Sequence, residues 1–382
     1  MRRVLLYTLF VLVILSPFQG QPARAQNSSA ADPEPVSGSV VCPPGVYAVA
    51  PDDCLLAGPS EYLTHLAGEG IPYPSLPLAT YSPPAELTDL AYQYFKVIDK
   101  QVTLYSSLED LVSNQASSRT LKPGELFFSY VAGPYDQDAA YLLRSGEWIR
   151  GDGARVGSAV PAFQGLLFKS QPRNAFGWVL EETESRSAPG LDSPGTGKIY
   201  RASDIMHGRA DVVQIYAIQA AGGVNWLLIG PDEWVNASYV ARVDPHTTPP
   251  EGVTTDRWIE VNLGEQTLSV YQNDHLIFAT LVSSGVMGWD TRPGLFQIYK
   301  KKVTETMTLS GTTDTEHSGF YYLEDVPWTM YFDEDRALHG EYWHTKLGYT
   351  YSHGCVNLSV GDAHWLFNWA NEGDFVYVRG AP

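Results

Sequence analysis

The chain has 382 residues, of which 44% are hydrophobic and 18% are charged, and its formal net charge is −18. This length and apolar content allow a large buried core and more than one domain. The acidic balance argues against a nucleic-acid-binding protein, because neutralising phosphates requires a basic face that this composition does not supply.

The first 25 residues predict a secretory signal peptide. Arg2 and Arg3 precede an apolar run at residues 4–15, and Ala23 and Ala25 form a small-x-small cleavage site. The run is too short to span a bilayer comfortably. We therefore expect an exported protein in the cell wall, periplasm or extracellular space, without stable membrane insertion after cleavage. An uncleaved anchor is the alternative.

Residues 26–95 are interpreted as a linker followed by a small disulfide-containing segment. The linker is rich in Ser, Ala, Pro and Asp, and Cys42 and Cys54 enclose a short proline-containing loop. Because export places cysteines in an oxidising compartment, we predict that these two form a disulfide. Cys355 is then unpaired, which in an exported protein suggests a reactive thiol, with an inert buried thiol as the alternative. A helix is expected over residues 85–98.

Residues 96–160 and 161–246 contain an internal repeat. A Leu-Leu segment that ends at Trp148 recurs before Trp234, and each copy is followed by the tripeptide Ala-Arg-Val. Short strand-like segments with Gly, Asn, Asp and Pro between them predict two small β-barrels. The copies resemble bacterial SH3b-like wall-binding modules. We interpret the two tryptophans as barrel core rather than as ligand-stacking residues.

A proline-rich linker at residues 247–255 precedes a second kind of domain at 256–382. Alternating apolar residues predict an antiparallel sheet, and a capping box at residues 359–362 predicts a helix that ends near Gly373. Ala363, Leu366, Phe367 and Ala370 would form its buried stripe. The predicted strands are 259–263, 268–270, 276–282 and 375–378.

Cys355 lies in a segment that contains the groups of a cysteine acyl-transfer site. A thiol has a pKa of about 8.5, so a catalytic cysteine needs a neighbouring base. His339 or His353 could serve, and glycines lie where backbone must approach a substrate closely. The segment comprises His339-Gly340 and, further along, Ser352-His353-Gly354-Cys355-Val356-Asn357.

These residues resemble the signature of the L,D-transpeptidase (YkuD-like) catalytic domain, which cross-links bacterial peptidoglycan. Residues 258–268 resemble the opening hairpin of that family. Thr291-Arg292-Pro293-Gly294-Leu295-Phe296 resembles its Thr-Pro-x-Gly-x-Phe segment, with the proline displaced by one. The resemblance covers residues 258–379. It implies a mainly β fold, a catalytic β-sandwich with a short helix, preceded here by the two SH3-like β-barrel repeats.

The resemblance also implies a mechanism. Cys355 would attack a donor tetrapeptide stem at the bond between its diamino acid and the following D-alanine, and an acceptor amine would resolve the thioester. His339 matches the general base, and the Gly340 carbonyl would orient its ring. Backbone N–H groups of His353, Gly354 and Cys355 would form the oxyanion hole. The partners are then peptidoglycan stem peptides, and no cofactor is expected.

The remaining motif residues have less definite roles. Ser352 and His353 would hold the cysteine loop. For His353, direct proton transfer is an equal alternative to this structural role. Trp343 and Asn357 match family positions near the substrate, although Trp343 could equally be core. Tyr331 is expected to line the donor cleft. His344 has no assigned role.

The sequence leaves alternatives to this reading. With the same site, water could resolve the thioester, which gives an L,D-carboxypeptidase or endopeptidase. A non-catalytic wall-binding protein is an alternative from another class. A zinc site made of His339, His344, His353 and Cys355 lacks the His-x-x-x-His or Cys-x-x-Cys intervals, so no metal is predicted. A serine nucleophile is disfavoured because there is no Gly-x-Ser-x-Gly elbow. We expect a monomer.

Overall fold

A computed structural model describes residues 59–72, 76–97, 102–115, 117–121, 125–135, 140–151, 154–156, 160–308 and 321–381. The predicted signal peptide and the predicted Cys42–Cys54 disulfide lie outside these residues. None of the described helices is both long enough and apolar enough to cross a membrane.

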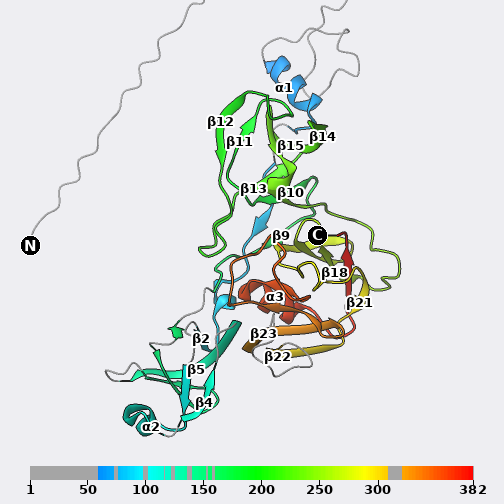
Figure 1. Cartoon of the computed structure of the whole chain (residues 1–382). Coiled ribbons are helices and arrows are strands. Elements are labelled where there is room, and N and C mark those ends of the chain that lie inside the picture. Colours follow the sequence, from blue (N-terminus) through cyan, green and yellow to red (C-terminus); the bar gives the residue numbers. More distant parts are fainter. Residues whose placement is uncertain are drawn as a thin grey trace, which may run out of the picture.

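The part of the chain that carries the cysteine motif lies in the middle of the molecule (Figure 1). We call it the catalytic part, after the family domain that it resembles. Its elements are β1 (Thr80–Tyr81), η2 (Ala85–Thr88), β9 (Leu166–Phe168), β18 (Arg257–Asn262), β19 (Thr267–Gln272), β20 (His275–Leu281), β21 (Gly294–Gln297), β22 (Lys300–Thr308), β23 (Tyr321–Asp333), β24 (Arg336–Gly340), β25 (Val356–Leu358), α3 (Val360–Trp369) and β26 (Phe375–Arg379). One sheet has the strand order β1-β9-β20-β19-β18-β26-β21, and the facing strands run β25-β24-β23, with β22 paired to β23.

A shared apolar core joins these two layers. Val261 and Val270 from one sheet pack in the same cluster as Met330 and Val356 from the other, together with Leu366 of α3. The predicted β-sandwich with a short helix is therefore confirmed for this part of the chain. The strands β18, β19, β20 and β26 fall where alternation of apolar residues predicted them.

The helix α3 begins where the capping pattern predicted. The side chain of Ser359 accepts a hydrogen bond from the backbone N–H of Asp362, as an N-cap should. The helix ends at Trp369, four residues before Gly373, and its buried face includes Ala363 and Leu366. Cys355 immediately precedes β25, and β25 leads through the N-cap residue Ser359 into α3.

The helix expected over residues 85–98 is wrong. Only a 3-10 turn, η2, forms there, and it is followed by β2 (Gln93–Val97). In β2 the side chains of Tyr94, Phe95 and Val97 are buried, and the strand pairs with β5 (Glu125–Tyr135). Pairing in a sheet overrides the local helix preference of this segment.

The first repeat forms one end of the molecule. Besides β2 and β5 it contains β3 (Val102–Tyr105), α2 (Leu108–Ser113), β4 (Ser117–Leu121), β6 (Ala140–Leu143), β7 (Trp148–Arg150) and β8 (Ala154–Val156). Its strand β5 pairs in parallel with β23, so its sheet continues the sheet of the catalytic part. No closed barrel is found in the described residues of this repeat, because the sheet is shared with β23.

The second repeat forms the other end (Figure 1). It contains β10 (Ala175–Val179), β11 (Thr183–Arg186), β12 (Gly195–Tyr200), β13 (Val212–Ile215), β14 (Ala217–Ala221), β15 (Val224–Gly230), β16 (Glu233–Asn236), η4 (Ala237–Tyr239) and β17 (Val240–Val243), with α1 (Pro59–Gly68) packed on it. Its described strands divide into a three-stranded and a five-stranded sheet rather than a closed barrel. The sequence repeat thus specifies two similar hairpins, β6–β7 and β15–β16, and not two closed SH3-like barrels.

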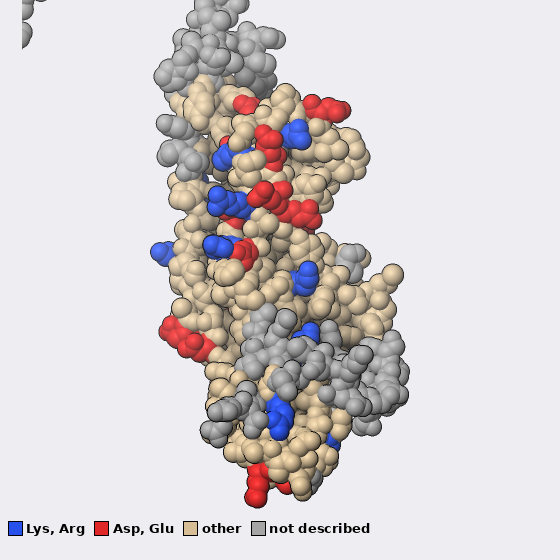
Figure 2. Space-filling view, turned by 60° about the vertical axis from the view of Figure 1, so that its left-hand side comes forward, with Lys and Arg blue, Asp and Glu red and all other residues tan. Residues whose placement is uncertain are grey.

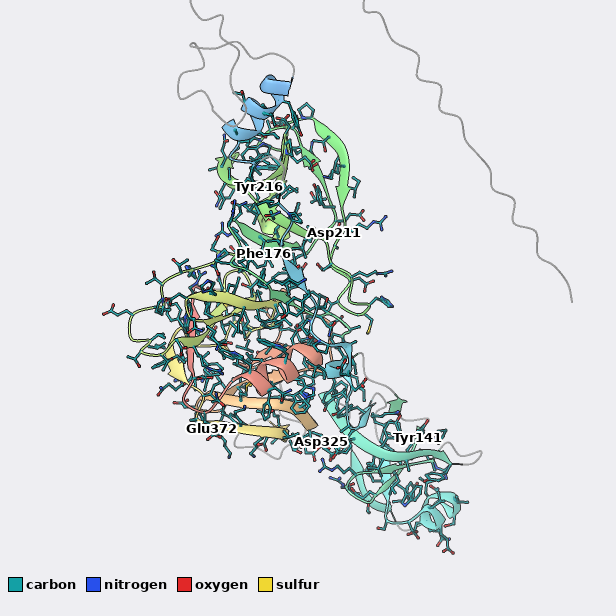
Figure 3. All side chains as sticks on the ribbon, turned by 180° about the vertical axis from the view of Figure 1, so that it is seen from behind. Tyr141, Phe176, Asp211, Tyr216, Asp325 and Glu372 are labelled. Carbon is teal, nitrogen blue, oxygen red and sulfur yellow. The ribbon has the colours of Figure 1, made fainter. Side chains whose placement is uncertain are left out.

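Two buried carboxylates of β23 form hydrogen bonds with the first repeat. Glu324 accepts hydrogen bonds from the Ser129 N–H at 2.9 Å and the Ser129 hydroxyl at 3.0 Å, and Asp325 accepts from the same hydroxyl at 2.6 Å. Arg144 forms an ion pair with Asp325, which lies at the junction of the two parts (Figure 3). The ring of Tyr94 stacks on Tyr342 at 3.6 Å. The repeat is therefore in contact with a segment that adjoins the cysteine site.

Charged side chains do not gather by sign on the face shown in Figure 2. Where atoms are coloured, Lys and Arg are interspersed with Asp and Glu.

Asp362 connects three segments of the catalytic part, and its replacement by alanine should be destabilising. Its carboxylate accepts hydrogen bonds from the Gly165 N–H at 2.9 Å and from the Thr280 hydroxyl at 2.5 Å. Removing it leaves the Gly165 N–H buried without an acceptor and leaves the Thr280 hydroxyl only the Leu281 carbonyl, at 3.3 Å. Asp362→Ala should therefore lower the free energy of unfolding by about 3 kcal/mol. Urea denaturation measures this change. Asn368→Ala, at an exposed position of the same helix, is the control, and an equal effect of both would contradict the assignment.

Candidate active site

A small cleft contains most of the predicted site residues. It lies beside β23 and the loop that precedes β25. Gly340, Gly354 and Tyr331 are not among its lining residues. The lining consists of Met307, Tyr321, Leu323, His339, Trp343, Tyr351, Ser352, His353, Cys355 and Asn357.

Two adjacent strands place the imidazole of His339 near the thiol. The strands β24 and β25 pair in parallel with His339 opposite Asn357, and Cys355 immediately precedes β25. His339 is buried, and its Nδ1 lies 3.0 Å from the Gly340 carbonyl oxygen. A carbonyl can only accept, so Nδ1 carries the proton and Nε2 has a free lone pair. This is the tautomer that a general base requires.

The loop before Cys355 is fixed by a serine. The Ser352 hydroxyl donates to the Cys355 carbonyl at 2.5 Å and accepts from the Gly354 N–H at 3.1 Å. Gly354 has a φ of 111°, which a residue with a Cβ rarely adopts. The Thr291 hydroxyl donates to the Gly354 carbonyl at 2.9 Å. The turn is therefore held by side chains on both sides, and the Gly354 N–H is already engaged.

The Cys355 side chain is partly buried. It donates a weak hydrogen bond to the Asp335 carbonyl, with an Sγ to oxygen distance of 3.8 Å. Burial raises the pKa of the thiol to about 11, and a hydrogen bond from the Ala337 backbone together with the charge of Arg336 offsets part of that rise. Burial also lowers the pKa of His339 to about 4, against a smaller opposite effect of the Gly340 carbonyl. At neutral pH the site therefore holds a neutral thiol and a neutral imidazole.

This resting state predicts a distinctive pH dependence of alkylation. The thiolate is the species that reacts with iodoacetamide, and a raised pKa means that thiolate forms only as the pH rises. The alkylation rate of Cys355 in the full chain should increase continuously through about pH 9, without a plateau in the range of about pH 6 to 8. Mass spectrometry of the labelled peptide measures it. A plateau near neutral pH would show a preformed thiolate–imidazolium pair and contradict the assignment.

Behind the cleft lies a buried polar network around His344. Its Nδ1 accepts from the Lys346 N–H at 3.1 Å, so its Nε2, 2.9 Å from the amide of Asn357, carries the proton. The amide oxygen of Asn357 must then face this ring, because only the oxygen can accept. Burial lowers the pKa of His344 to about 3. His344 is thus a neutral histidine that orients Asn357.

Glu341 belongs to the same network and was not predicted. It is fully buried, and its Oε2 accepts from the N–H groups of Trp343 at 3.2 Å and His344 at 3.0 Å. Burial raises the pKa of this carboxyl well above its usual value. An acidic residue two and three positions before two backbone N–H groups can accept hydrogen bonds from both. This spacing of Glu341 before Trp343 and His344 is the sequence signal that could have revealed the contact.

Aromatic residues that the sequence analysis missed surround His353. Its ring centroid lies 4.9 Å from that of Tyr321 and 5.1 Å from that of Trp289. Tyr321 and Leu323 alternate along β23 and line the cleft together, a pattern that strand periodicity could have revealed. Tyr331 lies further along β23, against Tyr299 at 6.1 Å. Burial first, then the charge of Glu305 and of Cys355, raises the pKa of Tyr331.

Residues 256–378 match the family model described as the YkuD L,D-transpeptidase catalytic domain. The matched residues make up about a third of the chain, and the match begins at residue 256. The resemblance seen in the motifs is thus confirmed for the catalytic part, whereas the SH3b-like resemblance of the two repeats is not. No curated protein matches the chain.

Solved L,D-transpeptidase structures are similar to this chain over about a third of its length. The crystal structure from Stackebrandtia nassauensis is 28% identical, with a TM-score of 0.27, and the match covers 34% of this chain and 57% of that one. A mutant of the Enterococcus faecium enzyme is 25% identical, with a TM-score of 0.29, and the match covers 32% and 50%. The E. faecium catalytic domain acylated by ertapenem is 25% identical, with a TM-score of 0.29, and the match covers 34% and 100%. The match thus spans about half of the length of the first two structures.

Proposed function

We propose that this chain is an exported L,D-transpeptidase that cross-links peptidoglycan stem peptides through a thioester at Cys355. The observation that carries the proposal is the shared cleft, which is lined by His339 of β24 and by Cys355, the residue just before the adjacent parallel strand β25. The family match over residues 256–378 supports the same chemistry. Export is supported by the apolar segment and cleavage site at the start of the chain.

In the first half-reaction Cys355 forms the thioester. The thiol turns from the Asp335 carbonyl towards His339, whose Nε2 takes the proton as sulfur attacks the carbonyl carbon between the diamino acid and D-alanine. The carbonyl oxygen becomes an oxyanion. When the intermediate collapses, the C–N bond breaks, and His339 returns the proton to the departing D-alanine amine.

Backbone donors stabilise the oxyanion in this proposal. The Gly354 N–H donates to Ser352, which leaves it less suited to this role than the sequence suggested. We assign the role of principal donor to the Cys355 N–H, which the turn fixes through Ser352 and Thr291. Loss of one such donor typically costs about 3 kcal/mol of barrier. Ser352 is accordingly a positioning residue, because it holds the turn.

In the second half-reaction an acceptor amine resolves the thioester. His339 takes a proton from the amine as its nitrogen attacks the thioester carbon, the C–S bond breaks, and the sulfur regains its proton from His339. The product is an amide between two diamino acids. The aromatic rings of Tyr321, Trp343 and Tyr351 line the cleft and limit the access of water, which would otherwise give a shortened tripeptide.

Substrate contacts are assigned to residues of the lining. The ring of Trp343 lies 5.6 Å from that of His339, so it can pack against the stem peptide beside the reacting carbonyl. Asn357 is oriented by His344. The other polar atom of its amide has no hydrogen-bond partner among the described residues, and it can orient the donor peptide bond. We propose that the chain acts as a monomer.

A carbapenem tests this proposal directly. This inhibitor class is expected from the resemblance of the motif, and it acylates a nucleophile without an acceptor. Incubation with the full chain should add the mass of one inhibitor, and peptide mapping should place it on Cys355. The Cys355→Ala variant should gain no mass. An adduct on another residue, or none on the folded protein, would overturn the proposed nucleophile.

A further inference from the structure

A second group of chemically capable side chains lies far from the cysteine cleft. His65 and Glu69 stand one turn apart on α1, and Asp232 lies in the turn between β15 and β16. One donor atom from each lies within 4.8 Å of the other two. The helix carrying two of them packs on the second repeat, where Leu66 and Ile71 are buried against Trp226. His65, Glu69 and Asp232 therefore lie where α1 packs against that repeat (Figure 1).

The spacing of these atoms fits a tetrahedral metal ion. Zinc binds imidazole nitrogen and carboxylate oxygen at about 2.0–2.2 Å, which places two ligand atoms about 3.4 Å apart. His65 Nε2 lies 3.2 Å from Asp232 Oδ2 and 3.7 Å from Glu69 Oε2. The i and i+4 positions of His65 and Glu69 put both on one face of the helix. Three protein ligands leave a fourth position for water.

Glu69 supplies an independent indication of a missing partner. Its Oε2 is buried and accepts no hydrogen bond from any described residue. Its Oε1 accepts from the Asp232 N–H at 3.4 Å, so the backbone of the turn orients the carboxylate. A metal ligand is commonly held by such a second contact. Without a cation, the one counter-charge within 4 Å of this oxygen among the described residues is His65, at 3.7 Å, which is charged only when it is protonated. A buried carboxylate oxygen beside a second carboxylate then costs free energy.

Another histidine–aspartate pair, in the second repeat, shows what an ordinary surface histidine looks like in this chain. His207 lies 2.9 Å from Asp204, but the third charged group there is Arg209, at 2.6 Å from the same carboxylate. A guanidinium completes that cluster and excludes a cation. At His65 the third group is a carboxylate.

We propose that His65, Glu69 and Asp232 bind one divalent metal ion, for which the nitrogen and oxygen donor set favours zinc. The ion would link α1 to the β15–β16 turn, because its ligands come from both. It would thereby restrict movement of α1 relative to the second repeat. The sequence analysis predicted no metal, and this site does not involve the cysteine chemistry.

Zinc titration of the full chain tests the site. The Cys355→Ala variant is used as the parent, because a thiol beside imidazoles could bind zinc by itself. Calorimetry with zinc chloride after chelator treatment should show one ion per chain at this site. Glu69→Gln and Asp232→Asn keep the side-chain shape but remove a charged ligand, and each should weaken binding by at least about tenfold. His207→Gln is the matched control and should bind as the parent does.

Hydrogen exchange separates loss of the site from loss of the fold. Zinc should slow amide exchange in residues 62–71 of the parent and leave it unchanged in Glu69→Gln and Asp232→Asn. Without zinc, all of these proteins should show the same exchange in β15 and β16. Equal zinc affinity in parent and ligand variants, or no binding by the parent, would overturn the proposal.

Discussion

The Cys355→Ala variant is expected to release no measurable D-alanine from a tetrapeptide-stem muropeptide. The thiol lines the cleft and forms the covalent bond in our mechanism, so its removal eliminates both half-reactions. Removing a catalytic nucleophile has lowered the turnover rate by about a million-fold in a protease studied in this way. Chromatographic detection of free D-alanine measures the effect on the full chain.

The fold of this variant must be shown to be intact. Alanine leaves the Ser352 bond to the backbone carbonyl of residue 355 in place, because that bond does not use the sulfur. Urea denaturation should therefore resemble that of the wild type. D-alanine release at an appreciable fraction of the wild-type rate by a folded variant would show that Cys355 is not the nucleophile.

The His339→Ala variant is expected to slow acylation by roughly a hundred- to ten-thousand-fold, the range for a lost general base. The resting thiol is neutral and has a raised pKa, so attack without an imidazole depends on the scarce thiolate. Stopped-flow measurement of carbapenem acylation gives the rate constant. The rate of the variant should also rise more steeply with pH than that of the wild type, because hydroxide replaces the missing base.

Two other histidines serve as controls for His339. His344 is hydrogen-bonded to Asn357 and takes no proton in our mechanism. His344→Ala should therefore alter substrate orientation and slow acylation far less than His339→Ala does. His353 is packed between Tyr321 and Trp289, and the sequence left its role open. If His353→Ala slowed acylation as much as His339→Ala and changed its pH dependence in the same way, His339 would be the wrong choice of base.

The catalytic part was predictable because its signals are local. The capping serine of α3, the alternating strands and the residues around Cys355 each determine structure within a few positions. His339 and Cys355 line the same cleft because two short parallel strands pair, and the motif implied a shared site through its resemblance to a family. The orientation of the His339 ring by Gly340 was expected in the same way and is present.

What the sequence could not reveal depends on long-range pairing. The first repeat shares its sheet with β23 through β5, a contact between segments nearly two hundred residues apart, so alternation within the repeat suggested a separate barrel. Likewise β9, which falls in the predicted second module, pairs with β20 of the catalytic sheet. The neutral state of the thiol and imidazole also depends on burial, which follows from the packing of both layers.

Incubation of the full chain with a tetrapeptide-stem muropeptide and an acceptor stem tests the central claim most directly. Mass spectrometry of the products distinguishes the possible fates of the thioester. We predict release of D-alanine together with a dimer joined through the two diamino acids, and neither product with Cys355→Ala. A shortened tripeptide without dimer, even with excess acceptor, would show that water resolves the thioester and that the enzyme is a hydrolase. No reaction of the folded wild-type chain with either substrate would contradict catalysis altogether.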